Sequence, residues 1–248
     1  MISRNIPQRR ALADLTGPMP KHIAVIMDGN RRWARERNLP IIEGYRRGMT
    51  ALRETTRACR DFGVPILTVY GFSEENWKRE TSEISLLFEL CCAFARTELD
   101  ALRRENVRVR VIGRIEALPR APRKALEELV LRTAGNSGTV LNIAVNYSAR
   151  TEMCDAIKAL ANDVHAGTVT PDSIDDDTLA SYLYTAGLPD PDLLIRPGGE
   201  SRLSNFLLYQ VAYTELWMTD VYWPEFSPAH FADAIAEFQR RQRRFGGA

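Results

Sequence analysis

The 248-residue sequence has little of several features that would assign it to a class at once. Its four cysteines (Cys59, Cys91, Cys92 and Cys154) show neither zinc-site nor disulfide spacing, which favours reduced thiols in a cytoplasmic protein. No apolar run approaches the roughly 18 residues of a membrane-spanning helix. The N-terminus carries basic residues but no apolar core, so it does not resemble a secretory signal.

Excess charge of one sign is also missing. Lys and Arg number 33 against 32 Asp and Glu, giving a net charge of +1, so no global attraction to nucleic acid is expected and any anion site must be a local arginine cluster. No glycine-rich nucleotide loop, GxSxG elbow or HExxH pair occurs. The histidines His22, His165 and His230 are far apart, and we interpret them as structural or surface residues.

Short apolar runs alternate with helical patterns along the chain. This alternation predicts a single α/β domain with a mainly parallel sheet flanked by helices on both faces. Residues 1–20 contain three prolines and little periodicity, so we expect a flexible lead-in before a domain spanning 21–248. Strands are predicted at 22–27, 66–72, 107–113, 140–147, 192–198 and 215–221, and helices near 43–62, 83–105, 120–134, 149–165, 175–186 and 228–244.

Polar residues gather where four of these strands end, which is where ligands bind in parallel sheets. After the first strand, Asp28 precedes a Gly-Asn turn and a helix that begins with Arg31 and Arg32. A diphosphate there would balance the arginines, and Mg²⁺ would be needed between the diphosphate and Asp28. The alternative is that Asp28 caps the helix and the arginines form a solvated face.

The fifth strand ends in a second anion-site pattern, in the segment LLIRPGGESRLSNF. Arg196 leaves an apolar run, Pro-Gly-Gly lets the backbone approach a ligand, and Arg202 and Ser204 add donors. We interpret this segment as a second phosphate site. The alternative is an ordinary loop with a buried ion pair between Arg196 and Glu200.

Four segments, MDGNRRWA, YGFSEENWKR, LNIAVNYSAR and IRPGGESRLSNFLLYQVAYTELWMTDVYWPEF, stand in an order that resembles the cis-prenyltransferases, the family of undecaprenyl diphosphate synthase. The resemblance runs from about Lys21 to Gly247. It implies a six-stranded parallel sheet, an apolar tunnel, a homodimer, and peripheral membrane contact if the product is long. It also implies Mg²⁺-dependent condensation of isopentenyl diphosphate with an allylic diphosphate to give a Z double bond.

The resemblance implies a role for each matching residue. The catalytic residues would be Asp28, Arg32 and Asn76, and the metal ligands Asp28 and Glu215. Ser73 and Trp77 would lie near the reacting carbons, while Arg79 and Glu83 would close over the site. The isopentenyl diphosphate would be held by Arg196, Arg202 and Ser204. The C-terminal element with Arg244 and Gly246 would reach across the dimer. The allylic substrate would contact Gly29, Asn30, Arg31, Arg32, Trp33 and Tyr45.

Several positions depart from the common family pattern. Arg31 stands where Gly is usual, Ile41 where Arg is frequent, Tyr45 where His is frequent, and Ser201 where some members have His. We propose that Arg31 supplies the charge missing at Ile41. The residues at positions of the implied tunnel give conflicting signals about product length. Met49 is bulkier than the residue often found there, whereas Gly71 and Thr139 are smaller than some counterparts, so the product length stays open.

Two alternatives to regular chain elongation follow. The altered allylic site would also suit irregular head-to-middle coupling of two dimethylallyl diphosphates. A non-catalytic partner subunit of a synthase is the other, although such subunits tend to lose the acid and arginines that are present here as Asp28 and Arg32.

Overall fold

The computed structural model describes residues 15–241 and contains one six-stranded sheet in the order β3-β4-β2-β1-β5-β6. Every pair of neighbouring strands is parallel, as predicted. The strand positions agree with the apolar runs of the sequence to within two residues at each end. The strands are β1 (His22–Ile26), β2 (Ile66–Ser73), β3 (Arg108–Ile112), β4 (Val140–Tyr147), β5 (Leu193–Pro197) and β6 (Glu215–Thr219).

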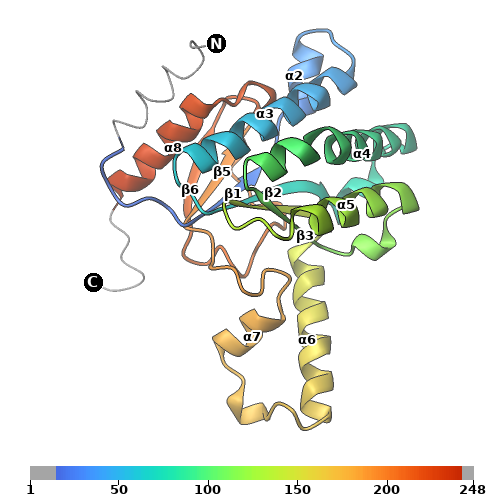
Figure 1. Ribbon diagram of the computed structural model, residues 1–248, viewed down its shortest axis with the longest axis vertical. Coiled ribbons are helices and arrows are strands. Elements are labelled where there is room, and N and C mark those ends of the chain that lie inside the picture. The colour runs from blue at the N-terminus through green and yellow to red at the C-terminus, as the bar shows by residue number, and fades with distance from the viewer. Residues whose placement is uncertain (1–14, 242–248) are drawn as a thin grey trace.

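Helices cover both faces of the sheet, and α6 extends well beyond it with α7 alongside (Figure 1). Within residues 15–241, no helix is both long and apolar enough to cross a membrane. The α-helices are α2 (Asn30–Glu36), α3 (Ile41–Asp61), α4 (Thr81–Arg104), α5 (Arg120–Thr133), α6 (Ala149–His165), α7 (Asp176–Tyr182) and α8 (Pro228–Arg240), and the 3₁₀ turns are η1 (Glu74–Lys78), η2 (Ile115–Ala117), η3 (Pro171–Ser173) and η4 (Trp223–Glu225).

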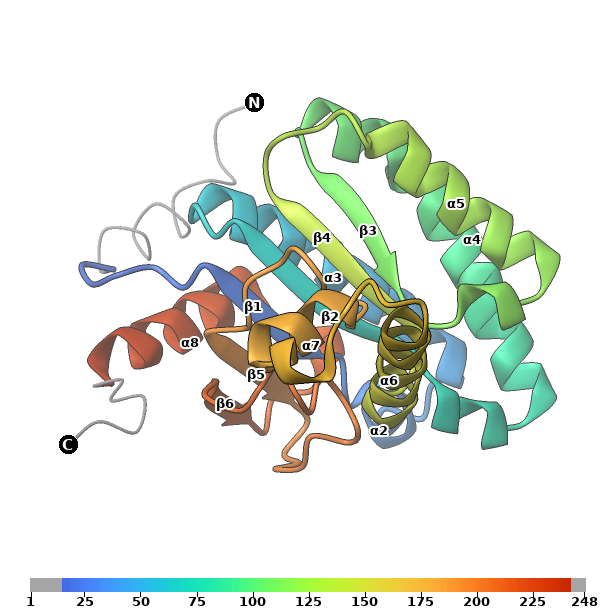
Figure 2. The ribbon, with the colours of Figure 1, turned by 90° about the horizontal axis from the view of Figure 1, so that it is seen from below.

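The two faces of the central strands bury different cores. In β1, Ile23 and Val25 join the core under α3, α4, α5 and α8, while Ala24 and Ile26 join a smaller core under the start of α6 and residues 203–211. Successive side chains of a strand point to opposite faces, so a strand covered on both sides is apolar throughout. The end-on view in Figure 2 shows α4 beside α5 and α8 near β6.

The structure differs from the predicted elements at three places. The helix predicted at 175–186 begins after its N-cap Asp175, which accepts a hydrogen bond from the Thr178 backbone N–H, and ends at Tyr182, because Leu183 has an extended backbone (ψ 157°). The helix predicted at 228–244 ends at Arg240, because Arg241 also has an extended backbone (ψ 141°). Residues 1–14 of the predicted lead-in lie outside the described part, whereas Gly17 is held on α8, because Gln239 Nε2 donates to its carbonyl oxygen at 2.8 Å.

The strand order creates a crevice beside β1. From β1 the chain moves to β2 on one side, and it later returns to β5 on the other side. The loops that follow β1 and β5 therefore diverge at this point, and such a switch point is where parallel sheets bind ligands. Asp28 follows β1 and Arg196 belongs to β5, so the fold brings the two predicted anion-binding segments together.

Candidate active site

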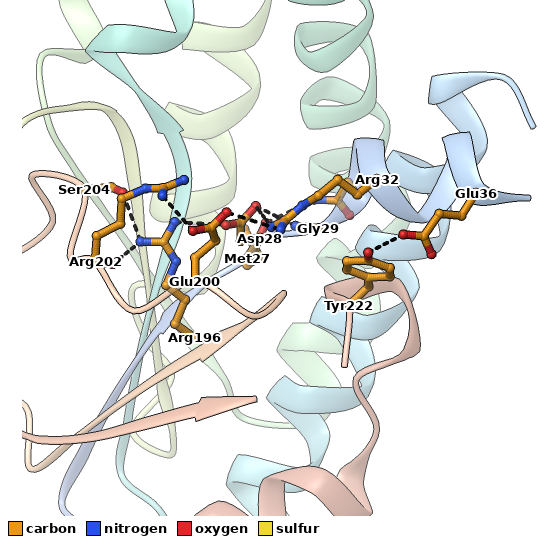
Figure 3. Close-up of polar contacts among 11 residues, drawn as sticks. Met27, Asp28, Gly29, Arg32, Glu36, Arg196, Glu200, Arg202, Ser204 and Tyr222 are labelled. Atoms are coloured by element: carbon orange, nitrogen blue, oxygen red, sulfur yellow. Dashed lines mark hydrogen bonds and ion pairs between the residues drawn. The ribbon is translucent and has the colours of Figure 1, made fainter. Parts of the chain in front are cut away.

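Asp28 is the centre of the site and is held by three donors (Figure 3). Its own neighbour Gly29 donates a backbone N–H to Oδ1 at 2.7 Å, Arg196 Nη2 donates to Oδ2 at 2.9 Å, and Arg32 Nη2 lies 3.2 Å from Oδ1. Burial raises the pKa of Asp28, but the Arg196 hydrogen bond and the charge of Arg32 outweigh it and lower the pKa below its usual value. Asp28 is therefore a carboxylate, and it does not cap α2, which has no side-chain cap.

Two glycines allow the ends of β1 and β5 to approach each other. Gly29 has φ +103°, and a Cβ there would lie 2.6 Å from Tyr222 Cδ1. Gly198 has φ +96°, and a Cβ there would lie 2.9 Å from Arg32 Nη2 and 3.3 Å from the Asp28 carbonyl oxygen. Both positions combine a backbone that favours glycine with a contact that excludes a side chain.

Arg196 joins the two predicted diphosphate sites. Its side chain is only 4% exposed, and besides Asp28 it donates from Nη1 to Ser204 Oγ at 2.9 Å and to the Arg202 carbonyl oxygen. Its Nε is buried and has no hydrogen-bond partner within the described residues. The alternative pairing of Arg196 with Glu200 is not found, because Glu200 contacts Arg32 at 3.3 Å and Arg202 at 2.6 Å.

The segment after β2 is fixed by side-chain hydrogen bonds. Asn76 Oδ1 accepts the Ser73 backbone N–H at 3.2 Å and so caps η1. Trp77 Nε1 donates to Asn146 Oδ1 at 2.8 Å, and its ring packs against Phe72 and Phe88. These contacts place Asn76 in the cavity wall, and leave the Trp77 side chain among apolar neighbours.

A second charged cluster surrounds Glu83 at the start of α4. Tyr45 donates its hydroxyl to Glu83 Oε1 at 2.5 Å, Arg79 Nη1 lies 3.0 Å from the same oxygen, and Arg31 Nη1 lies 3.8 Å from Oε2. Burial and then the bond to Glu83 raise the pKa of Tyr45, so it stays a neutral donor. Ile41, at the first turn of α3, is 37% exposed. Arg31 thus reaches the cluster of Tyr45, which the resemblance assigns to the allylic substrate, and of Arg79 and Glu83, which it assigns to closing over the site.

A cavity of about 580 Å³ opens beside these groups. Its polar wall meets an apolar wall, an arrangement suited to a ligand with a charged head and an apolar tail. The apolar tunnel that the resemblance implies stays a prediction, and this cavity lies beside the groups assigned to the substrates. Gly71 and Met49 line the cavity, whereas Thr139 does not. The polar lining includes Asp28, Asn30, Asn76, Arg79, Arg196, Arg202 and Ser204, and the apolar lining Ile26, Met27, Met49, Leu87 and Leu90.

Not every predicted site residue lies here. Glu215 begins β6 opposite Leu193, at the edge of the sheet away from Asp28, and accepts a hydrogen bond from Arg241 at 2.9 Å. Within one chain the expected metal pair of Asp28 and Glu215 is therefore not formed. Trp33 does not line the cavity but lies under the Arg37 guanidinium, 4.9 Å from it. Gly246 and Arg244 lie outside the described residues.

Asn205 lines the cavity and is a residue that the sequence analysis did not single out. It follows Ser204 and contacts Glu75, Ser148 and the backbone of Arg150. The one signal in the sequence was an asparagine in a predicted loop, because asparagine tolerates positive φ, and Asn205 indeed has φ +63°.

An ionised acid between the buried Arg196 and the partly exposed Arg32, beside a cavity with an apolar wall, suits a ligand with an anionic head and an apolar chain. Comparison with known proteins agrees. The chain belongs to the cis-prenyltransferase family, since residues 26–246 match the family described as "Putative undecaprenyl diphosphate synthase". It is a prenyl-transferring enzyme, and no property of the site favours the alternative of a non-catalytic subunit.

Relatives and solved structures give the same assignment. The chain is 53% identical to the isoprenyl transferase of Geobacillus kaustophilus, over 94% of this chain and 91% of the relative, and 50% identical to that of Bacillus subtilis, over 94% and 90%. The structure of lavandulyl diphosphate synthase from Lavandula x intermedia, in complex with dimethylallyl diphosphate, matches with a TM-score of 0.89 at 32% identity, covering 92% of this chain and 98% of that one. A "probable undecaprenyl diphosphate synthase" from Campylobacter jejuni matches with a TM-score of 0.76 at 31% identity, covering 93% and 100%.

Proposed function

We propose that the enzyme condenses isopentenyl diphosphate with an allylic diphosphate, in the presence of Mg²⁺, to form a Z-configured polyprenyl diphosphate. The observation that carries the proposal is the position of Asp28 between Arg32 and Arg196, with arginines on both sides and an apolar cavity beside them. Two diphosphates can lie on either side of one carboxylate there, and an allylic chain can extend into the apolar part.

The allylic diphosphate is assigned to the side formed by α2 and the Glu83 cluster. Arg31 and Arg32 stand in the first turn of α2, and Asn30 Oδ1 is buried without a hydrogen-bond partner among the described residues. Arginines at a helix N-terminus are unfavourable until an anion binds. A diphosphate would supply that anion and draw on Arg79, whose present partners are Tyr45 and Glu83.

The diphosphate of isopentenyl diphosphate is assigned to Arg196, Arg202 and Ser204. Ser204 and Arg196 are already hydrogen-bonded at 2.9 Å, so their donors converge without rearrangement of β5. The Arg202 side chain is 64% exposed and paired with Glu200, and it can turn toward an incoming phosphate. Arginine suits this role because its planar donors match phosphate oxygens.

The residues present fit a Mg²⁺ ion bound mainly by substrate. Asp28 offers carboxylate oxygens, and no group of three or more potential metal ligands occurs in residues 15–241. Mg²⁺ commonly takes one or two carboxylates, with phosphate oxygens and water completing its ligands. Its charge would stabilise the departing diphosphate. With Asp28 holding a metal ion, Arg32 and Arg196 would each lose one carboxylate partner and would be free to contact a phosphate oxygen.

The reaction follows from these positions. Arginines around the allylic diphosphate stabilise the negative charge that develops as the C1–O bond breaks. The double bond of isopentenyl diphosphate then attacks C1 and forms the new carbon–carbon bond. Transfer of a proton from C2 to a phosphate oxygen of the substrates creates the new double bond, with diphosphate as the other product. Asn76, fixed by Ser73, lies in the wall where these carbons would meet.

The homodimer also stays a proposal. In the described chain β6 ends the sheet, so its outer edge can pair with another molecule. Exposed apolar side chains lie at this end of the sheet, with Leu216 39% exposed and Tyr213 69% exposed. A second copy that covers them would bury apolar area and bring the C-terminal residues of one chain toward the other.

Irregular coupling of two dimethylallyl diphosphates is a second candidate. It is favoured by one observation, the TM-score of 0.89 with lavandulyl diphosphate synthase in complex with dimethylallyl diphosphate. Regular elongation is favoured by the isoprenyl transferases at about half identity over nearly the whole chain.

Product analysis tests both candidates. The purified enzyme is incubated with dimethylallyl, geranyl or farnesyl diphosphate, each with and without isopentenyl diphosphate, and with Mg²⁺ or a chelator. Regular elongation predicts Z products only when isopentenyl diphosphate and Mg²⁺ are both present. Product from dimethylallyl diphosphate alone would establish the irregular reaction, and no product in any mixture would reject both.

A further inference from the structure

The segment between β5 and β6 carries Arg202 and Ser204 in a backbone conformation that needs external support. Positive φ angles occur at Ser204 (+51°), Asn205 (+63°) and Leu207 (+48°). Such angles are uncommon for residues other than glycine and persist where surrounding contacts fix them. The contacts that hold Ser204 in place therefore decide where its hydroxyl points.

Asn205 docks this segment on the N-terminus of α6. Its carbonyl oxygen accepts the Ala149 N–H at 3.0 Å, and its Oδ1 accepts the Arg150 N–H at 3.1 Å. The next N–H, of Thr151, is accepted by the N-cap Ser148 at 3.3 Å. Two of the first three free N–H groups of α6 are thus satisfied by one residue far along the chain, which stabilises both partners.

The amide nitrogen of Asn205 connects the same segment to η1. Nδ2 donates to Glu75 Oε1 at 2.8 Å and to Ser148 Oγ at 2.8 Å. Glu75 directly precedes Asn76 and lines the cavity. On the other side of Glu75, the carboxylate of Glu74 accepts the Thr151 hydroxyl at 2.6 Å, so η1 is tied to α6 as well. Asn205, the residue after Ser204, therefore contacts both η1, through Glu75, and α6, through Arg150.

We propose that Asn205 is a positioning residue that couples the second diphosphate site to the segment at the reacting carbons. This inference rests on the proposed function. The Asn205–Glu75 hydrogen bond fixes the distance between Ser204, assigned to the isopentenyl diphosphate, and Asn76, assigned to the carbons of the substrates. Neither Asn205 nor Glu75 needs to touch a substrate for this effect.

The substitution Asn205→Asp separates positioning from folding. Aspartate keeps an acceptor for the Arg150 N–H and tolerates positive φ, and its charge is favourable at a helix N-terminus. It loses both Nδ2 donor bonds and sets two carboxylates against each other at Glu75. We expect a small fall in melting temperature, because the charge at the helix N-terminus offsets only part of the lost hydrogen bonding, together with a rise of about tenfold in the Kd and KM for isopentenyl diphosphate. The KM for the allylic substrate should stay within about twofold.

Adding the substitution Glu75→Gln to N205D should restore the binding of isopentenyl diphosphate. In N205D/E75Q, the new amide at position 75 would donate to the new carboxylate at position 205, so the hydrogen bond returns with its polarity reversed. The Kd for isopentenyl diphosphate should recover to within about threefold of the wild-type value. Asn106→Asp is the matched control, because Asn106 also has positive φ (+55°) and is bonded to Ser137, at the opposite edge of the sheet.

Calorimetric binding of isopentenyl diphosphate distinguishes failure of the inference from failure of the proposed function. If the wild-type enzyme binds no isopentenyl diphosphate and makes no product from it, the proposed function is wrong. If the wild type binds and turns it over, two results overturn the inference alone. One is a Kd for N205D equal to that of N106D, and the other is a defect in N205D that E75Q does not reverse.

Discussion

Arg196 Nη2 lies 2.9 Å from Asp28 Oδ2, which joins the ends of β1 and β5 across 168 positions of sequence. The acid and the arginine that are assigned to two different substrates therefore neutralise each other before any substrate binds. Because the Arg196 side chain is buried, its charge needs such a partner at all times. Under the proposed function, substrate phosphates would replace this internal carboxylate as the partner of Arg196.

Asp28→Ala should abolish turnover and also destabilise the protein. Losing the proposed metal ligand should lower kcat/KM by at least about a hundredfold. Arg196 would be left buried without a carboxylate, which should lower the free energy of unfolding by about 1–3 kcal/mol. Steady-state kinetics and urea unfolding measure the two effects.

Pyrophosphate without metal provides the control for Asp28→Ala. Only in the variant can the anion contact Arg196 and Arg32 without facing the Asp28 carboxylate, so it should raise the melting temperature of the variant more than that of the wild type. Wild-type turnover by the variant, or equal stabilisation of the two proteins, would remove the central role given to Asp28.

Arg31→Gly should weaken the allylic site. Arg31 is the only α2 arginine that reaches the Glu83 cluster in the described structure, and Ile41 supplies no charge there. We expect kcat/KM for the allylic diphosphate to fall by about tenfold or more, while the KM for isopentenyl diphosphate changes little. Arg35→Gly has a similar helix-propensity cost of roughly 1 kcal/mol in the same helix and should leave the kinetics unchanged. Equal kinetics of the two variants would show that Arg31 does not replace the missing charge.

Gly198→Ala tests the close approach between β5 and β1. Both Gly198 (φ +96°) and Gly63 (φ +74°) have backbones that disfavour alanine, but only at Gly198 would the new Cβ meet neighbours, whereas nothing lies within 4 Å at Gly63. Each substitution should cost about 1–2 kcal/mol of stability. Activity should fall in G198A, because Arg32 must move, and stay near wild type in G63A. An active G198A enzyme would mean that Arg32 need not occupy this position.

Glu152→Gln tests a buried carboxylate behind the segment that carries Ser204. Glu152 is 1% exposed and accepts hydrogen bonds from the Tyr147 hydroxyl, Gln210 Nε2 and the Tyr184 N–H. An amide group would place donors against these donors, so stability should fall by about 1–3 kcal/mol. The exposed Glu128→Gln should change stability by less than about 0.5 kcal/mol.

The difference in stability between wild type and E152Q should change with pH in a direction that the pKa of Glu152 determines. Burial raises the pKa of Glu152 above its usual 4.5, despite the hydrogen bonds that favour the ionised form. A raised pKa means that the contribution of Glu152 is full below about pH 4.5 and declines as pH rises through the folded-state value. The stability gap between wild type and E152Q should therefore narrow as pH increases from about 4.5 toward about 8. Urea unfolding across this range measures the gap, and a widening gap would contradict the raised pKa.

The sheet and most of the site could be predicted from the sequence because they depend on local pattern. Buried parallel strands are apolar throughout, and the polar residues at the end of each run mark the ligand edge, which identified Asp28 and the segment of Arg196. Glu215 was assigned to the metal by resemblance alone, and the structure places it at the start of β6, away from Asp28. Glu215 directly precedes the apolar run LWMT, which predicts that it begins a strand. The start of a strand lies at the edge of a parallel sheet opposite to the ligand-binding edge, so this position could be predicted from the sequence.

Partner choice within the site could not be predicted in the same way. Whether Arg196 would pair with Glu200 or Asp28 depends on how the loop after Gly198 turns, and both acids were available. The role of Asn205 depends on partners at positions 75 and 148, and no local pattern connects residues so far apart. Sequence pattern determines which groups reach the sheet edge, whereas loop geometry decides which of them meet.

The late place of β5 in the chain has a consequence for synthesis. β1 is central in the sheet, yet one of its two neighbours consists of residues 193–197. A nascent chain that has released only the residues before β5 holds β1 with one side unpaired, and unpaired apolar strands promote aggregation. Folding must wait for these distant contacts, which slows it. Ribosome-bound intermediates of this enzyme are therefore expected to depend on chaperones until the fifth strand emerges.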